Sequence, residues 1–131
     1  MREPQPGTVW SAGRLQRRGQ YQAWIRSKAW LRRRAWWLTE WRGRYGNEPI
    51  CVVCGRPWTL KSGDLHHRSY AHLGQERFED LIPLDRGCHE ALHQLWDRTP
   101  AWRALGREHA TAGLIALLRQ HHPQQVAPDD E

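Results

Sequence analysis

The strongest constraint on the fold of this chain is a pair of short segments with matching spacing. Cys51 and Cys54 are separated by two residues and are followed by Gly55. That spacing lets both sulfurs bind one tetrahedral metal ion from a tight turn. Asp85 and Cys88 repeat the spacing further along the chain, just before a segment with helical character. The pattern predicts a small domain whose knuckles meet at a metal.

The length and the termini are typical of one domain outside the secretory route. At 131 residues the chain has room for a single modest core. No stretch approaches the roughly 20 apolar residues that a membrane span needs, and Met1 to Gly7 carries charges and prolines where a signal peptide needs an apolar run. We therefore expect a cytoplasmic, reducing setting. In that setting three cysteines, an odd number, are interpreted as metal ligands rather than disulfides.

Positive charge is concentrated at one end of the chain. Residues 1–44 contain eleven Lys and Arg residues and two acids, whereas residues 45–131 contain nine bases and twelve acids. A basic arm of this kind is typical of a protein that binds a polyanion, because neutralised phosphates release condensed counterions. A solvated face that aids solubility explains the same charge equally well.

The chain is expected to contain a flexible basic arm (1–20), one domain (21–120) and a disordered tail (121–131). Ser27 is a suitable N-cap for a helix from about Lys28 to Tyr45, and Gly46 is suited to end it. In this basic helix an apolar stripe is expected to face the core. The expected stripe is Leu31, Ala35, Leu38 and Trp41, and at least three of Trp24, Trp30, Trp36, Trp37 and Trp41 are expected in the core.

The rest of the chain predicts short strands followed by helices, which is a small α+β fold. Ile50 to Val53 and Asp64 to His67 are predicted as strands, and Leu81 to Leu84 as an apolar run that leads into a turn. A helix is expected from Cys88 to Trp96. One last helix is expected to begin at Thr99-Pro100. Its apolar stripe is Leu105, Leu114, Ile115, Leu117 and Leu118.

From about Tyr21 to His93 the chain resembles the HNH endonuclease family, in the branch that pairs cysteine knuckles with a double histidine. The resemblance covers just over half the chain and leaves out the C-terminal helix. The residues that carry it are Cys51-Val-Val-Cys54-Gly, Leu65-His66-His67-Arg68-Ser-Tyr70, Leu73-Gly74-Gln-Glu76, Glu79-Asp80-Leu81-Ile-Pro-Leu84 and Cys88-His89-Glu-Ala-Leu-His93.

This resemblance implies a ββα-metal finger over residues 51–96, with a zinc knuckle, that hydrolyses phosphodiesters with one divalent ion (Mg²⁺, Mn²⁺ or Ni²⁺). By position His67 corresponds to the general base, and an imidazole with a pKa of about 6.5 suits that role. His66 and His89 correspond to ligands of the catalytic metal. Asp80 stands where the family more often has asparagine, and it is expected to orient the ring of His67.

The role of His93 stays open. It lies one helical turn after His89 and shares its face. It is interpreted as a third metal ligand, as a phosphate-binding donor or as a surface histidine beside the site. His72 lies in the loop between the two halves of the motif and is expected to contact that loop or the substrate rather than a metal.

The second knuckle departs from the family pattern at Asp85, where a cysteine is expected. A carboxylate oxygen is an acceptable zinc ligand, so Cys51, Cys54, Asp85 and Cys88 are predicted to hold structural zinc less tightly than four thiolates would. The competing interpretation makes Asp85 a turn residue in a knuckle without metal.

Three functions follow from these patterns. The leading hypothesis is an endonuclease that cuts duplex DNA with low sequence specificity, and the family resemblance suggests a phage or mobile-element context. The second is a non-catalytic zinc module that binds nucleic acid or protein, and the third is a nuclease for RNA. The candidate nucleic-acid contacts are Arg32, Arg33, Arg34 and Arg68. No pattern indicates the oligomeric state.

Overall fold

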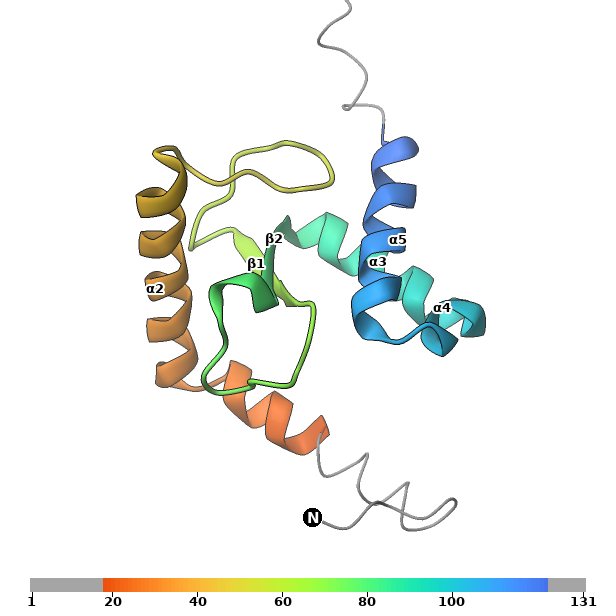
Figure 1. Ribbon diagram of the computed structural model, residues 1–131, viewed down its shortest axis with the longest axis horizontal. Coiled ribbons are helices and arrows are strands. Elements are labelled where there is room, and N and C mark those ends of the chain that lie inside the picture. Colours follow the sequence, from red (N-terminus) through yellow and green to blue (C-terminus); the bar gives the residue numbers. More distant parts are fainter. Residues whose placement is uncertain (1–17, 123–131) are drawn as a thin grey trace, which may run out of the picture.

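The computed structural model describes residues 18–122, so most of the predicted arm and tail lies outside the described residues. The fold is a small α+β arrangement in which a two-stranded antiparallel sheet separates α2 from the three C-terminal helices (Figure 1). Residues 18–25 are also helical, so residues 18–20 belong to a helix and not to the predicted arm. The elements are α2 (Lys28–Tyr45), β1 (Gly63–His67), η1 (Phe78–Asp80), β2 (Leu81–Asp85), α3 (Arg86–Arg98), α4 (Pro100–Ala104) and α5 (Arg107–Gln120).

Helix α2 has the predicted ends, but the face that it buries matches the predicted apolar stripe only in part. The Ser27 hydroxyl accepts a hydrogen bond from the Trp30 backbone N–H at 3.1 Å, and Gly46 ends the helix at a φ of 68°. Both caps act locally and confirm the predicted bounds. The predicted stripe was right for Leu38, which is buried, and for Trp41, which packs against the core, but wrong for Leu31, which is 59% exposed, and for Ala35. The other buried residues of the helix are Trp30 and Trp37. Indoles remove more apolar area from water than a leucine does, and they decide which face packs inward.

The sheet pairs β1 with β2 so that Gly63 lies opposite Asp85 and His67 opposite Leu81. Gly63 is required there, because a Cβ atom would lie 2.2 Å from Nε1 of Trp58. The run from Leu81 to Leu84 is therefore strand rather than the approach to a turn.

The predicted strand at 50–53 was wrong. Ile50 forms only an isolated bridge with Pro57, and the residues after Cys51 form turns. Gly55 has a φ of 77° and donates its backbone N–H to the Cys51 carbonyl at 2.9 Å. Both sulfurs can reach one metal ion only if the chain reverses between Cys51 and Cys54. In a strand the extended backbone would keep the two side chains apart.

The C-terminal segment forms two helices where one was predicted. Gly106 has a φ of 86° and separates α4 from α5, so the expected stripe is interrupted and Leu105 is 55% exposed. The ring of Trp102 then lies against Gly113, where a Cβ atom would come within 2.5 Å of it. None of the helices within residues 18–122 combines the length and apolar character of a membrane span.

The core is divided by the sheet into two clusters of buried residues. On the α2 side the five tryptophans between residues 24 and 41 take part, with Trp30 and Trp37 buried and the other three partly buried. On the other side β2, α3 and α5 enclose the cysteine turn; the residues buried there are Cys51, Val53, Cys54, Leu84, Cys88, Leu92, Ala110 and Leu114.

Replacing Trp37 tests how far the fold depends on the α2 cluster. Trp37 is fully buried, stacks on Phe78 at a centroid distance of 5.7 Å, and its indole N–H has no partner among the described residues. We expect Trp37→Ala to lower the free energy of unfolding by about 3–5 kcal/mol, because it leaves a cavity in the core. The substitution breaks no hydrogen bond, so the loss reports packing alone. Leu31→Ala on the exposed face of the same helix should cost less than about 0.5 kcal/mol. Urea denaturation of both variants measures this, and equal losses would contradict the packing described.

Candidate functional site

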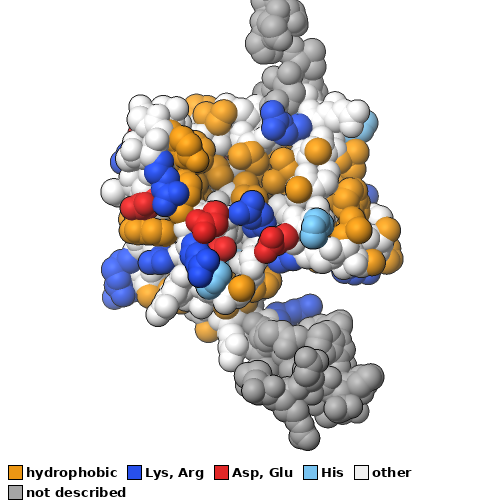
Figure 2. Space-filling view, in the orientation of Figure 1, with side chains coloured by type: hydrophobic (Ala, Val, Ile, Leu, Met, Phe, Trp, Pro, Cys, Tyr) orange, Lys and Arg blue, Asp and Glu red, His pale blue; other side chains and the backbone are white. Residues whose placement is uncertain are grey.

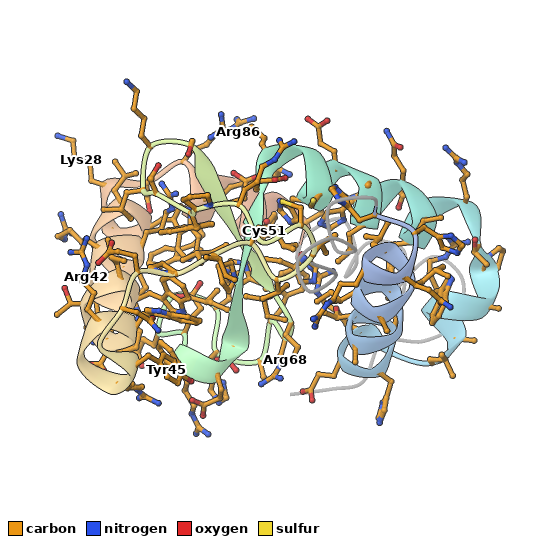
Figure 3. All side chains as sticks on the ribbon, turned by 90° about the horizontal axis from the view of Figure 1, so that it is seen from above. Lys28, Arg42, Tyr45, Cys51, Arg68 and Arg86 are labelled. Carbon is orange, nitrogen blue, oxygen red and sulfur yellow. The ribbon has the colours of Figure 1, made fainter. Side chains whose placement is uncertain are left out.

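Four potential metal ligands meet where the cysteine turn contacts the start of α3. Cys51 and Cys54 come from the turn, Asp85 from the end of β2 and Cys88 from the first turn of α3. One ligand atom from each of these residues lies within 4.8 Å of every other. Figure 3 shows Cys51 in the interior of the molecule, whereas Lys28 and Arg42 project from the outer side of α2. The predicted group of three cysteines and one aspartate is therefore brought together.

Asp85 has two tasks, one for each carboxylate oxygen. Its Oδ1 accepts the Cys88 backbone N–H at 2.7 Å and so caps α3, whereas Oδ2 lies 2.8 Å from the sulfur of Cys54. The same side chain therefore caps α3 and belongs to the group of potential metal ligands.

The chemistry of the cluster fits a metal ion. Burial and the hydrogen bond to Asp85 raise the pKa of Cys54 to about 11, and burial also raises the pKa of Cys88. Burial raises the pKa of Asp85 as well, but hydrogen bonds from Cys54 and Cys88 outweigh it and hold that pKa below its usual value. Without a cation the thiols stay protonated, whereas coordination to zinc removes their protons. This donor set therefore suits zinc.

A second cluster consists of three histidines on the other side of the α3 start. His66 lies on β1, and His89 and His93 lie one turn apart on α3. Nε2 of His89 is 3.3 Å from Nδ1 of His66 and 3.1 Å from Nε2 of His93. Ligands of a tetrahedral ion with bonds of 2.0–2.1 Å lie about 3.3 Å apart, so the spacing suits one metal ion. The structure thus groups His93 with His66 and His89.

Two further residues orient these rings. Asp64 Oδ2 lies 3.0 Å from Nδ1 of His89, and Thr111 Oγ1 lies 3.0 Å from Nε2 of His66. Each contact occupies one ring nitrogen and leaves the other facing the cluster, as the outer partners of metal-bound histidines do. Asp64 could have been found from its place two residues before His66, on the same strand face. Thr111 lies on α5 and has no local signal.

Burial keeps two rings of the cluster, those of His66 and His93, neutral. Burial lowers the pKa of His66, and it lowers the pKa of His93 to about 4 with a contribution from the charge of His89. The hydrogen bond from His89 lowers the pKa of Asp64, which stays ionised as an acceptor. Neutral imidazoles near pH 7 present the lone pairs that a metal ion needs.

His67 is buried away from the cluster and has a carboxylate partner that the sequence analysis did not assign. Its ring packs against Trp30, Tyr21 and Tyr70, with centroids 5.0, 5.6 and 5.5 Å away. Nε2 of His67 lies 2.7 Å from Oε2 of Glu76, which is fully buried and also accepts the Trp24 indole N–H at 2.7 Å. Nδ1 of His67 has no partner among the described residues.

The structure corrects the expected role of Asp80. Its Oδ2 accepts the Arg77 backbone N–H at 2.9 Å and lies 3.0 Å from Nδ1 of His72, so it closes the turn of η1 instead of holding His67. His72 is thereby fixed within its loop. Glu76 was present in the quoted motif, but only the folding of residues 68–80 over the strands turns its side chain toward His67.

Most of the predicted nucleic-acid contacts are engaged within the protein. Arg33 donates to the Glu76 carbonyl, Arg34 to the Gly63 carbonyl at 2.7 Å and Arg68 to the Glu79 carbonyl at 2.6 Å. Arg32 is exposed. Figure 2 shows Lys and Arg side chains interspersed with acidic and hydrophobic ones on one face, without a continuous basic surface.

Comparisons with protein-family models, with curated proteins and with solved structures find no match for this chain. The geometry shows a cluster of three cysteines and an aspartate, a histidine cluster that also takes residues from α3, and a buried histidine–glutamate pair. The three groups are different chemical environments, and each of them includes at least one residue from β1 or α3.

The first prediction from this site concerns zinc. We expect about one tightly held zinc ion per chain in protein purified without chelator, and structural zinc contributes on the order of 10 kcal/mol to the folding of small domains. Asp85→Asn keeps an oxygen to cap α3 but loses the charged ligand, so its zinc affinity should fall at least about tenfold. Elemental analysis and chelator competition measure both quantities. Soluble, folded wild-type protein without zinc would refute the assignment.

The second prediction concerns Glu76 and pH. Although burial raises its pKa, hydrogen bonds from His67 and Trp24 hold the pKa of Glu76 below the usual 4.5. A depressed carboxylate pKa stabilises the folded state above the unfolded pKa, and this stabilisation is lost as the pH falls through the folded value. Between about pH 5 and pH 3 the wild-type free energy of unfolding should therefore fall more steeply than that of Glu76→Gln. Parallel slopes in urea denaturation across this range would contradict an ionised Glu76 carboxylate in the folded protein.

Proposed function

We propose that the protein is a metal-dependent endonuclease of the HNH type, which hydrolyses phosphodiester bonds of DNA on a ββα-metal finger formed by β1, β2 and α3. The observation that carries the proposal is the convergence of His66, His89 and His93, whose facing nitrogens lie 3.1 and 3.3 Å apart. Because no base-reading motif is present, duplex DNA with little sequence preference is the proposed substrate.

In this proposal His66, His89 and His93 would hold a divalent ion, which would supply the positive charge that polarises the scissile phosphate and stabilises the leaving oxygen. Asp64 accepts the Nδ1 proton of His89 and thereby directs the Nε2 lone pair of that ring toward the cluster. The Thr111 hydroxyl fixes the ring of His66 in the same way, leaving Nδ1 available. The protein thus orients these nitrogen ligands before any substrate arrives.

His67 is the proposed general base. The Glu76 carboxylate accepts the Nε2 proton, so the lone pair is at Nδ1, the atom that takes a proton from the attacking water. The positive charge that develops on the ring is stabilised by the same carboxylate. The buried ring of His67 is packed against Trp30, Tyr21 and Tyr70, so water reaches Nδ1 only when one of its neighbours moves aside. Tyr70 is 41% exposed and lies in a loop, which leaves it room to move.

The burial of His67 favours a second candidate function. If the aromatic rings around His67 do not move aside, its pair with Glu76 only stabilises the fold. The chain is then a zinc module that binds nucleic acid without cutting it. The two functions share the cysteine cluster and differ in whether the histidine cluster acts on a phosphodiester.

Incubation with supercoiled plasmid separates them. With Mg²⁺, Mn²⁺ or Ni²⁺ we expect the wild type to nick the plasmid, His89→Ala to lose cleavage with every metal, and His67→Ala to be slower by about 10²–10⁴-fold. His109→Ala, an exposed histidine outside both clusters, should cut like the wild type.

The outcomes distinguish the parts of the proposal. A wild type that binds plasmid but leaves it intact in every metal would establish the second candidate instead. If His67→Ala cuts like the wild type while His89→Ala is inactive, the metal assignment stands and the general base is another group. Single-stranded RNA in the same assay tests the RNA-directed hypothesis.

A further inference from the structure

A cavity of about 660 Å³ lies beside the histidine cluster. His93 contributes to its wall from α3, Arg107 from the start of α5, and Arg18 and Tyr21 from the helical residues 18–25; Tyr70 and Trp96 add aromatic surface. A cavity of this size holds a small ligand or part of a larger one. One wall thus belongs to the candidate metal site, and two cationic side chains face the same space.

Arg107 is held in place by groups that do not neutralise it. Its Nε donates to the His67 carbonyl at 2.7 Å, and its guanidinium carbon lies 4.1 Å from the centroid of the Tyr70 ring. Within residues 18–122 no carboxylate forms an ion pair with it, and its two terminal nitrogens have no hydrogen-bond partner. Asp97 lines the same cavity without pairing with Arg107.

This arrangement carries an electrostatic cost that an anion removes. A half-buried guanidinium has lost part of its hydration, and burial lowers the pKa of Arg107. Most arginines in such positions are paired, because the desolvation is otherwise uncompensated. Here one edge of the guanidinium is fixed by a backbone carbonyl and one face by a tyrosine ring. The free edge presents parallel N–H donors, the geometry that binds a phosphate through two hydrogen bonds.

We propose that Arg107 binds a backbone phosphate of the nucleic acid in this cavity, with Arg18 as a second cation, and so positions the strand beside His93. The choice of nucleic acid as the source of the phosphate rests on the proposed function, whereas the anion site itself rests on Arg107. Arg107 lies on the C-terminal helix, outside the stretch that resembles HNH endonucleases, and is a substrate-positioning residue supplied by that added helix.

The test measures binding apart from cleavage. Fluorescence anisotropy with a fluorescein-labelled 12-mer DNA duplex, without added Mg²⁺, Mn²⁺ or Ni²⁺, gives the Kd at several salt concentrations. We expect Arg107→Gln to weaken binding at least about tenfold and to reduce the slope of log Kd against log salt by about one, since one phosphate contact is lost. Arg119→Gln is the matched control, because it removes the same charge from the exposed far end of α5 and should change Kd less than about threefold.

Arg107→Lys separates charge from structure. Lysine keeps the charge, but it cannot donate to the His67 carbonyl and stack on Tyr70 at the same time as the planar guanidinium does. It should therefore restore part of the affinity and most of the salt slope. Thermal unfolding of each variant checks that the fold is intact. If Arg107→Lys binds as weakly as Arg107→Gln and both unfold at lower temperature, Arg107 only supports the structure and the inference is overturned.

Failure of this inference is distinct from failure of the proposed function. An unchanged Kd and salt slope in Arg107→Gln overturn the phosphate site even if the wild type nicks plasmid. Arg107-dependent binding by a protein that never cuts plasmid supports the phosphate site and leaves the non-catalytic module as its context. Competition by inorganic phosphate that is stronger for the wild type than for Arg107→Gln supports a phosphate rather than a base as the bound group.

Discussion

The start of α3 is the constraint on which both candidate metal sites depend. Asp85 ends β2, caps the helix through one oxygen and faces the cysteine turn with the other. Cys88 and His89 are neighbours in sequence, but their side chains lie about 100° apart around the helix. Cys88 therefore enters the cysteine cluster and His89 the histidine cluster. A displacement of this helical turn would disturb both sites together. The cysteine cluster is in this sense the basis of the histidine geometry, although none of its residues touches a substrate in the proposed mechanism.

The sheet provides the second half of that geometry. Its register fixes Asp64, His66 and His67 relative to α3, and the alternation of strand side chains sends His66 to the α3 side while His67 packs under the aromatic residues around Trp30. Two adjacent histidines therefore have opposite surroundings: one beside polar partners and other imidazoles, the other beside a buried carboxylate. Strand β1 carries Asp64, His66 and His67, and the first part of α3 carries Cys88, His89 and His93, so these two short elements together contribute to both clusters.

Much of this could be predicted where the determinants are local. The ends of α2 follow from Ser27 and Gly46, and the members of the cysteine cluster follow from two repeated spacings. The buried face of α2 could not be predicted from periodicity alone, since it depended on which large side chains met Phe78 and Trp58 from elsewhere in the chain. The exchange of Asp80 for Glu76 as the partner of His67, and the roles of Thr111 and Arg107, arise from contacts across 9 to 45 positions in sequence. Single-sequence patterns carry no information on such pairs, because neither residue constrains the other until the chain has folded.

The connection between β1 and β2 is fastened part way along its length. Within residues 68–80 the carbonyl of Glu76 is bonded by Arg33 and its carboxylate by Trp24 and His67, so one residue ties the connection to two helices and a strand. Closing a loop costs entropy that rises with its length, and a fixed point divides one long closure into two short ones. Extra residues inserted at the exposed Ala71 would lengthen only the first of these, whereas loss of the Glu76 contacts would merge both into a single long segment. The connection should thus tolerate an insertion at Ala71, whereas it should not tolerate a substitution of Glu76, five residues further along.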